Sequence, residues 1–122
     1  MNNAEIEVYI KALSEIAAEE WHFRRIFERA IGLLDVRDAQ KVRSQYAWFI
    51  KSVEASLDTV GLRIVDDLEG QDYDAGMAVS PLNLCDYEPN EPLIVEQMIE
   101  PIIMLDNKIS KKGAVILGRA KG

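Results

Sequence analysis

The sequence lacks most of the residue types from which metal centres, disulfides and catalytic sites are built. Its 122 residues include one cysteine, Cys85, and one histidine, His22. A single cysteine excludes an internal disulfide, and one cysteine with one histidine cannot supply a zinc-ligand set. A Ser-His-Asp set could draw only on His22, and the acidic neighbours of Cys85, Asp86 and Glu88, disfavour a reactive thiolate. We therefore expect no metal, no cofactor and no enzymatic activity.

Long apolar runs and a basic charge excess are also missing. No apolar stretch approaches the roughly 20 residues needed to cross a bilayer, and the opening residues MNNAEIEVYIKALSE lack the basic and apolar regions of a signal peptide. Acidic residues number 21 against 14 lysines and arginines, which gives a net charge of −7. This charge argues against nucleic acid or a membrane as partner. We expect a cytoplasmic protein whose partner carries basic surface.

Acidic side chains gather in one segment, where they suggest a cation site. The segment contains Asp66, Asp67, Glu69, Asp72 and Asp74. An EF-hand loop needs acids at alternate positions, a central glycine and a distal glutamate, and this spacing does not provide them. We interpret the segment as a solvated loop.

Proline is confined to the second half of the chain, whereas the first half repeats apolar residues at helical spacing. The apolar content of 48% and the charged content of 29% are ordinary for a folded protein. We predict an α+β protein with two parts. Amphipathic helices occupy residues 1–60 as a dimerisation region, and a small antiparallel β-domain follows in residues 61–122.

Two apolar stripes predict the helices. Between residues 6 and 34, two rows of apolar residues recur at intervals of seven or fourteen: Ile6, Leu13, Phe27 and Leu34, and then Tyr9, Ile16, Phe23 and Ala30. A second stripe reaches residue 60 in steps of four or three: Val42, Tyr46, Phe49, Val53, Leu57 and Val60.

Capping residues set the predicted helix ends. Asn2 or Asn3 can cap the first helix and Asp35 the second, and Gly61 suits the left-handed position that follows a helix. The pattern falters near Gly32, which leaves open one long rod or an antiparallel hairpin.

Four segments read as strands, at residues 62–65, 77–84, 93–104 and 114–119. Pro101 lies inside the third and cannot donate a ladder hydrogen bond, so we expect a break or an edge position there. Asp106-Asn107 predicts a tight turn.

The first helix carries more apolar surface than one shorter helix and a small sheet can cover. Excess apolar surface often marks an interface, and a homodimer is the economical outcome. The predicted dimer contacts are Ile6, Leu13, Phe27, Leu34, Val42, Phe49 and Val53. The alternative is that these residues form an intramolecular core.

Residues 46–74, YAWFIKSVEASLDTVGLRIVDDLEGQDYD, resemble the junction in GrpE, the nucleotide exchange factor of DnaK-type chaperones. In that family an amphipathic helix ends at a glycine, a strand Gly-Val-x-x-Ile follows, and an acidic loop holds Gly and then Phe-Asp-Pro. The matching residues are Gly61-Leu62-Arg63-Ile64, Gly70 and Tyr73-Asp74-Ala75. Residues 112–116, KGAVI, are similar to the family's closing strand. The family's His-Glu-Ala is replaced by Gly76-Met77-Ala78.

This resemblance implies a shortened, divergent cochaperone that binds a DnaK-type ATPase domain and promotes nucleotide release without a catalytic residue. The sheet would contact the partner through Val79, Pro81, Met98, Ile102 and Met104, which are otherwise ordinary sheet core. Two alternatives remain: an interaction module of the same fold without exchange activity, and a ligand-binding or enzymatic domain.

Overall fold

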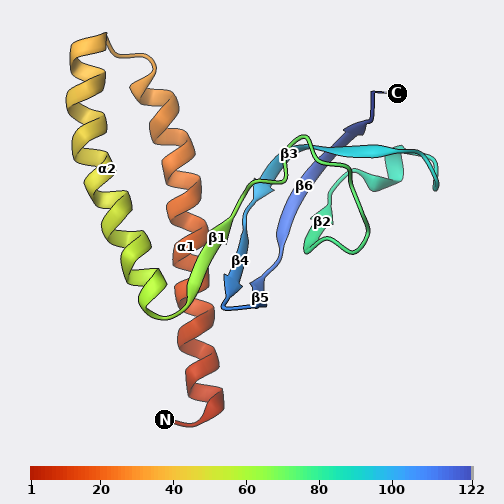
Figure 1. Cartoon of the computed structure of the whole chain (residues 1–122), viewed down its shortest axis with the longest axis horizontal. Coiled ribbons are helices and arrows are strands. Elements are labelled where there is room, and N and C mark those ends of the chain that lie inside the picture. Colours follow the sequence, from red (N-terminus) through yellow and green to blue (C-terminus); the bar gives the residue numbers. More distant parts are fainter. Residues whose placement is uncertain (122) are drawn as a thin grey trace.

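A helical hairpin leads into a small β-domain in the computed structural model, which describes residues 1–121 (Figure 1). The hairpin consists of α1 (Asn3–Ile31) and α2 (Val36–Thr59). The β-domain contains β1 (Leu62–Val65), β2 (Val79–Pro81), β3 (Leu93–Glu100), β4 (Ile102–Leu105), β5 (Lys108–Lys111) and β6 (Gly113–Arg119), with a short 3-10 helix at Leu84–Asp86. The predicted α+β class, helices first, is confirmed. Residue 122, the last of the predicted β part, lies outside the described residues.

Each helix begins at a side-chain cap. The Asn2 side chain accepts a hydrogen bond from the backbone N–H of Glu5 at 2.9 Å, and that of Asp35 accepts one from Asp38 at 2.8 Å. These caps satisfy N–H groups that the first helical turn leaves without partners. Helix α1 ends at Ile31, next to Gly32, where the apolar pattern falters, and the chain turns over residues 32–35.

The two helices form an antiparallel hairpin, which settles the choice that the sequence left open. Early residues of α1 face late residues of α2: Ala17 packs with Leu57, whereas the Phe27 ring lies 4.7 Å from that of Tyr46. The Arg24–Glu54 ion pair lies between these two levels at 3.2 Å. Near the turn, Ile31, Tyr46 and Ile50 form the buried centre of the hairpin.

Gly61 joins the hairpin to the sheet. Its φ of +82° is in the left-handed region that glycine adopts without a Cβ clash, as the sequence predicted. The chain then enters β1 at Leu62, which is buried.

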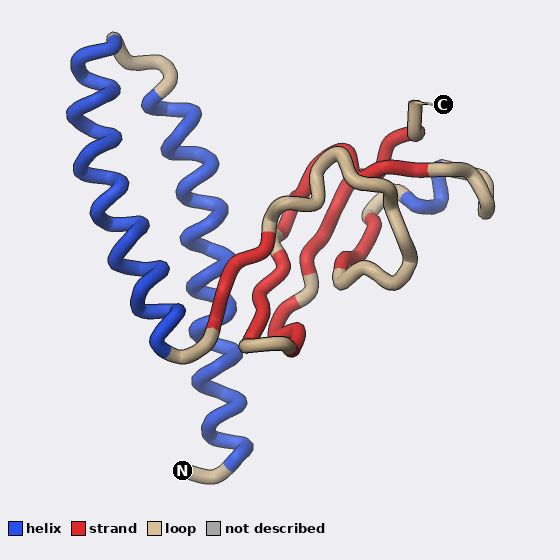
Figure 2. Tube along the Cα trace, in the orientation of Figure 1, coloured by secondary structure: helices blue, strands red, loops and turns tan. Residues whose placement is uncertain are grey.

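The strands form two three-stranded sheets, ordered β1-β4-β5 and β2-β6-β3 (Figures 1 and 2). Strands β1 and β5 run antiparallel to β4, and β3 runs antiparallel to β6. The pairing of β2 with β6 is parallel, which corrects the prediction of a purely antiparallel domain. Residues 82–112, which lie between β2 and β6, supply the long connection that a parallel pair requires.

The observed strands differ from the predicted ones at two places, β2 and β5. The segment predicted as a strand at residues 77–84 contains only the three-residue β2 before the 3-10 helix. The segment at residues 93–104 is broken at Pro101, as predicted, into β3 and β4. Strand β5 was missed because its sequence, Lys108-Ile-Ser-Lys, gives only one apolar residue between lysines. The predicted turn at Asp106-Asn107 connects β4 to β5.

The helices and the sheets share their cores. Trp21 of α1 is 3% exposed and packs among the buried residues of the β2-β6-β3 sheet. Ala17 and Leu57 pack with Leu62 and Ile103 of the other sheet. The division near residue 60 is therefore a change of secondary structure and not a separation of two cores.

Candidate functional site

His22 and Cys85 lie on different elements, and each has an acidic side chain beside it. The His22 Nε2 atom lies 3.0 Å from a carboxylate oxygen of Glu100, so it links α1 to β3. Cys85 is exposed beside Asp86, in the segment after β2. Among residues 1–121, no group of three or more His, Cys, Asp or Glu side chains could hold a metal ion. In the same residues, no helix is both long and apolar enough to cross a membrane.

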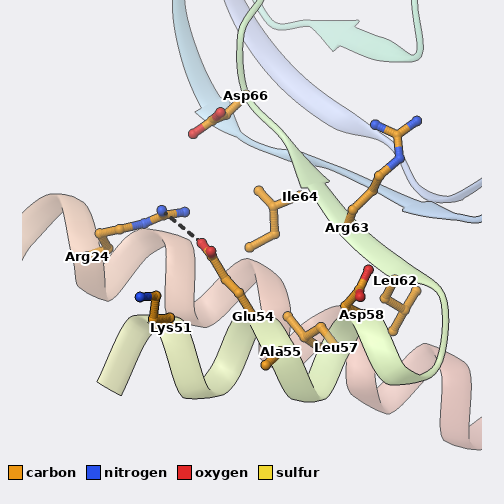
Figure 3. Close-up of a pocket in the computed structure, with 10 residues that line it drawn as sticks. All are labelled: Arg24, Lys51, Glu54, Ala55, Leu57, Asp58, Leu62, Arg63, Ile64 and Asp66. Carbon is orange, nitrogen blue, oxygen red and sulfur yellow. Dashed lines mark hydrogen bonds and ion pairs between the residues drawn. The ribbon is translucent and has the colours of Figure 1, made fainter. Parts of the chain in front are cut away.

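A cavity of about 520 Å³ lies where the hairpin meets β1 (Figure 3). Its charged lining consists of three cations and three anions: Arg24, Lys51, Arg63, Glu54, Asp58 and Asp66. The Arg24–Glu54 ion pair crosses part of it, and Asp66 accepts a hydrogen bond from the Trp21 indole N–H at 2.8 Å. The charges of the lining balance, and three of the six charged groups are already engaged in these two contacts.

The predicted dimer contacts divide into two sets. Leu13, Phe27, Val42 and Val53 are half-buried, because they pack inside the hairpin or against the sheet. Ile6, Leu34 and Phe49 keep more than two fifths of their surface exposed. Packing within the chain thus accounts for much of the surface of the four half-buried residues. The three exposed residues remain available to a partner.

An apolar depression runs along the hairpin between α1 and α2. We call it the outer groove, and it combines two hollows that share Phe23 and Phe49. On α1, Phe23 stands two residues from Trp21 and therefore points nearly opposite to it, away from the sheet. The lining residues are Ala12, Glu15, Ile16, Glu19, Glu20, Phe23, Phe27, Val42, Gln45, Tyr46, Phe49 and Val53.

Glu20 lies in this groove with little access to water. Its side chain is 4% exposed, and neither carboxylate oxygen has a hydrogen-bond partner among the described residues. The nearest cation is Arg24, at 3.7 Å, and that guanidinium also donates to Glu54. Burial raises the pKa of the Glu20 carboxyl above its ordinary value of 4.5, because the charged form loses hydration. Arg24 opposes this rise, and the negative charges of Glu54 and Asp66 add to it.

The predicted partner contacts in the sheet require a correction. Val79, Met98 and Ile102 are at most 7% exposed and belong to the sheet core, so they cannot contact a partner without opening that core. The alternative that they are ordinary core residues holds. Pro81 and Met104 are half-buried, and Met104 packs against the same core.

Two exposed leucines of the β-domain lie just after β2, whereas Ile109, also exposed, lies on β5. Leu82 is 56% exposed and Leu84 47%, and with the half-buried Pro81 they form what we call the apolar rim. Strand β2 is one edge of its sheet, and Figure 1 places it on the side of the β-domain away from α2. Sequence reasoning missed the leucines because it assigned them to a strand.

Hydrogen bonds fix the apolar rim on β6. The Asn83 side chain donates to the carbonyl oxygen of Leu117 and accepts from its backbone N–H, at 3.0 and 2.8 Å. The Tyr87 hydroxyl donates to the same carbonyl at 3.0 Å, and the Leu82 N–H donates to Val115 at 2.9 Å. The segment is thus held in one conformation, with its leucines directed outward. A preorganised apolar surface loses little entropy on binding.

No family model, no curated protein and no solved structure matches the chain.

Proposed function

We propose that the chain is a GrpE-like cochaperone, which binds the ATPase domain of a DnaK-type chaperone through its β-domain and promotes nucleotide release. The apolar rim is the observation that carries this proposal. It is a hydrogen-bonded, exposed apolar surface that directly follows an edge strand, remote from the hairpin, and apolar residues at such a surface mark protein contacts. The order of helix, left-handed Gly61, strand and acidic loop is the order on which the family resemblance rests.

The mechanism is differential binding. A protein that binds the open ATPase cleft more tightly than the closed cleft shifts the population toward the open form, from which nucleotide leaves. Each tenfold preference for the open form supplies about 1.4 kcal/mol of this shift. The cochaperone needs no nucleophile or metal for this task. In this proposal the hairpin joins two copies, and each copy carries one β-domain.

The test is release of a fluorescent nucleotide from a DnaK-type ATPase of the same organism. We expect micromolar chain to accelerate release. The double variant Leu82→Asp and Leu84→Asp should lose the acceleration, because a carboxylate in an apolar contact costs affinity. Leu33→Asp is the matched control: Leu33 is 89% exposed at the tip of the hairpin, and its substitution should leave the acceleration unchanged.

A second candidate is an interaction module of the same fold without exchange activity. The observation that favours it is Gly76-Met77-Ala78, which stands where the family has His-Glu-Ala. Binding of the ATPase domain without faster nucleotide release would select this candidate. Absence of both binding and release would contradict both.

A further inference from the structure

We propose that a second copy of the chain covers the outer groove, and that this pairing takes up a proton on Glu20. The inference rests on the proposed homodimer and adds where the copies meet and what regulates their association. Its basis is the exposed area of the groove, the spacing of its residues and the surroundings of Glu20.

The exposed area is sufficient for a stable dimer. Ile16, Phe23 and Phe49 in the groove, and Tyr9 one heptad before Ile16, are each about half exposed, at 57, 50, 48 and 57%. At roughly 200 Å² for each large side chain, these four expose about 400 Å². A standard interface buries about 800 Å² on each partner, of which slightly more than half is apolar. The four side chains alone thus supply most of the apolar part.

The spacing of these residues fits a second copy. Tyr9, Ile16 and Phe23 follow each other at intervals of seven on α1, and Val42 and Phe49 do so on α2. A seven-residue repeat keeps the same side of a helix toward a partner helix, as in four-helix bundles. A second hairpin brings two helices with the same repeat, so each copy covers the other's exposed side chains.

Covering the groove changes the balance of charge at Glu20. An ionised carboxylate without hydrogen bonds is costly to bury, whereas the neutral acid costs less and can donate its O–H. The charged groups around it are Arg24 on α1, Glu54 on α2 and Asp66 after β1. Glu15 and Glu19 also line the groove, so the second copy adds further negative charge. Only Arg24 favours the ionised form, and it is shared with Glu54.

Proton uptake then follows from thermodynamic linkage. The paired state binds a proton at Glu20 more tightly than the separate chains do, so a lower pH favours pairing. The dimer Kd should fall by up to about tenfold per pH unit for each Glu20 that becomes protonated on pairing.

The experiment is sedimentation equilibrium of the whole chain at pH 7.5 and at pH 5.5, with circular dichroism as a check of folding. We expect the wild type to pair more tightly at the lower pH. Glu20→Gln, which carries no charge, should pair tightly at both values and lose most of the pH dependence. Glu88→Gln, an exposed carboxylate of the β-domain outside the groove, should keep the wild-type dependence and thus controls for the fall in overall net charge.

Phe49→Asp tests the groove itself and should abolish pairing at both pH values. If that variant is misfolded, Ile16→Asp, at a more exposed position, replaces it. A monomer at tens of micromolar and both pH values would overturn the second copy as occupant. Equal pH dependence in the wild type and in Glu20→Gln would overturn the role of Glu20. Nucleotide release is measured separately, so a failure of the exchange activity is distinguishable from either result.

Discussion

At the residue scale, Gly61 and Asp106 form a close contact at the junction of the hairpin and the sheet. The backbone N–H of Asp106 donates to the Gly61 carbonyl at 2.8 Å, and both residues have positive φ values, +53° and +82°. A Cβ added to Gly61 would lie 2.5 Å from Oδ1 of Asp106. The position therefore needs glycine for its backbone conformation and for the space around it.

Gly61→Ala should lower the free energy of unfolding by about 1–2 kcal/mol, because the added Cβ must displace the Asp106 carboxylate in addition to the left-handed strain. Urea unfolding followed by circular dichroism measures this change. Gly70→Ala is the control, because Gly70 has a φ of +86° and no atom within 4 Å of an added Cβ. That variant should lose only about 1 kcal/mol. Equal losses in the two variants would show that the contact with Asp106 does not matter.

At the element scale, the cap at Asp35 separates two helices that the apolar pattern alone could join. Residues 32–35 turn the chain, and Asp35 then begins α2 by accepting a hydrogen bond from the N–H of Asp38. The turn places Phe27 against Tyr46 and so creates the hairpin core. The cap therefore stabilises the first turn of α2, and α2 supplies half of the hairpin core.

Asp35→Ala should lower the free energy of unfolding by about 1 kcal/mol, because the first turn of α2 loses a side-chain acceptor. Thermal or urea unfolding would detect this loss. Asp35→Asn keeps an acceptor oxygen without the charge, so it should retain most of the stability. If asparagine cost as much as alanine, the charge near the helix N-terminus and not the hydrogen bond would be the stabilising feature.

At the scale of the whole molecule, the middle of α1 is held to the sheets at several points between Ser14 and Arg25. Ser14 and Ser110 hydroxyls lie 2.7 Å apart, and the Arg25 guanidinium donates to the Met98 carbonyl at 2.9 Å. Trp21 lies between these contacts, with its ring in the sheet core and its indole N–H on Asp66. Helices and sheets that share a core in this way lose their packing together.

We therefore expect one cooperative unfolding transition. In Trp48→Phe, the remaining Trp21 reports on the sheet core, whereas circular dichroism at helical wavelengths reports on α1 and α2. Trp48 is 74% exposed, so its replacement should change stability little. The two urea curves should coincide. Separate midpoints would mean that the hairpin and the β-domain unfold independently.

Local rules in the sequence determined much of the secondary structure. Helical periodicity and the side chains of Asn2 and Asp35 set the helix starts, Gly61 set the end of the hairpin, and Pro101 divided β3 from β4. Each of these features acts within a few residues, through a dihedral preference or one hydrogen bond. They could be predicted because no distant contact is needed to decide them.

Only the tertiary structure decided which apolar residues are buried and which remain at the surface. Met98 and Leu82 are both apolar residues in segments that the sequence predicts as strands. The first lies in the sheet core and the second in the apolar rim. The same holds for Trp21, placed in the sheet core, and for Phe23, placed in the outer groove. Burial depends on contacts between residues far apart in the chain, such as α1 against β4 and β2 against β6. Periodicity finds an apolar face, and the fold then determines what, if anything, covers it.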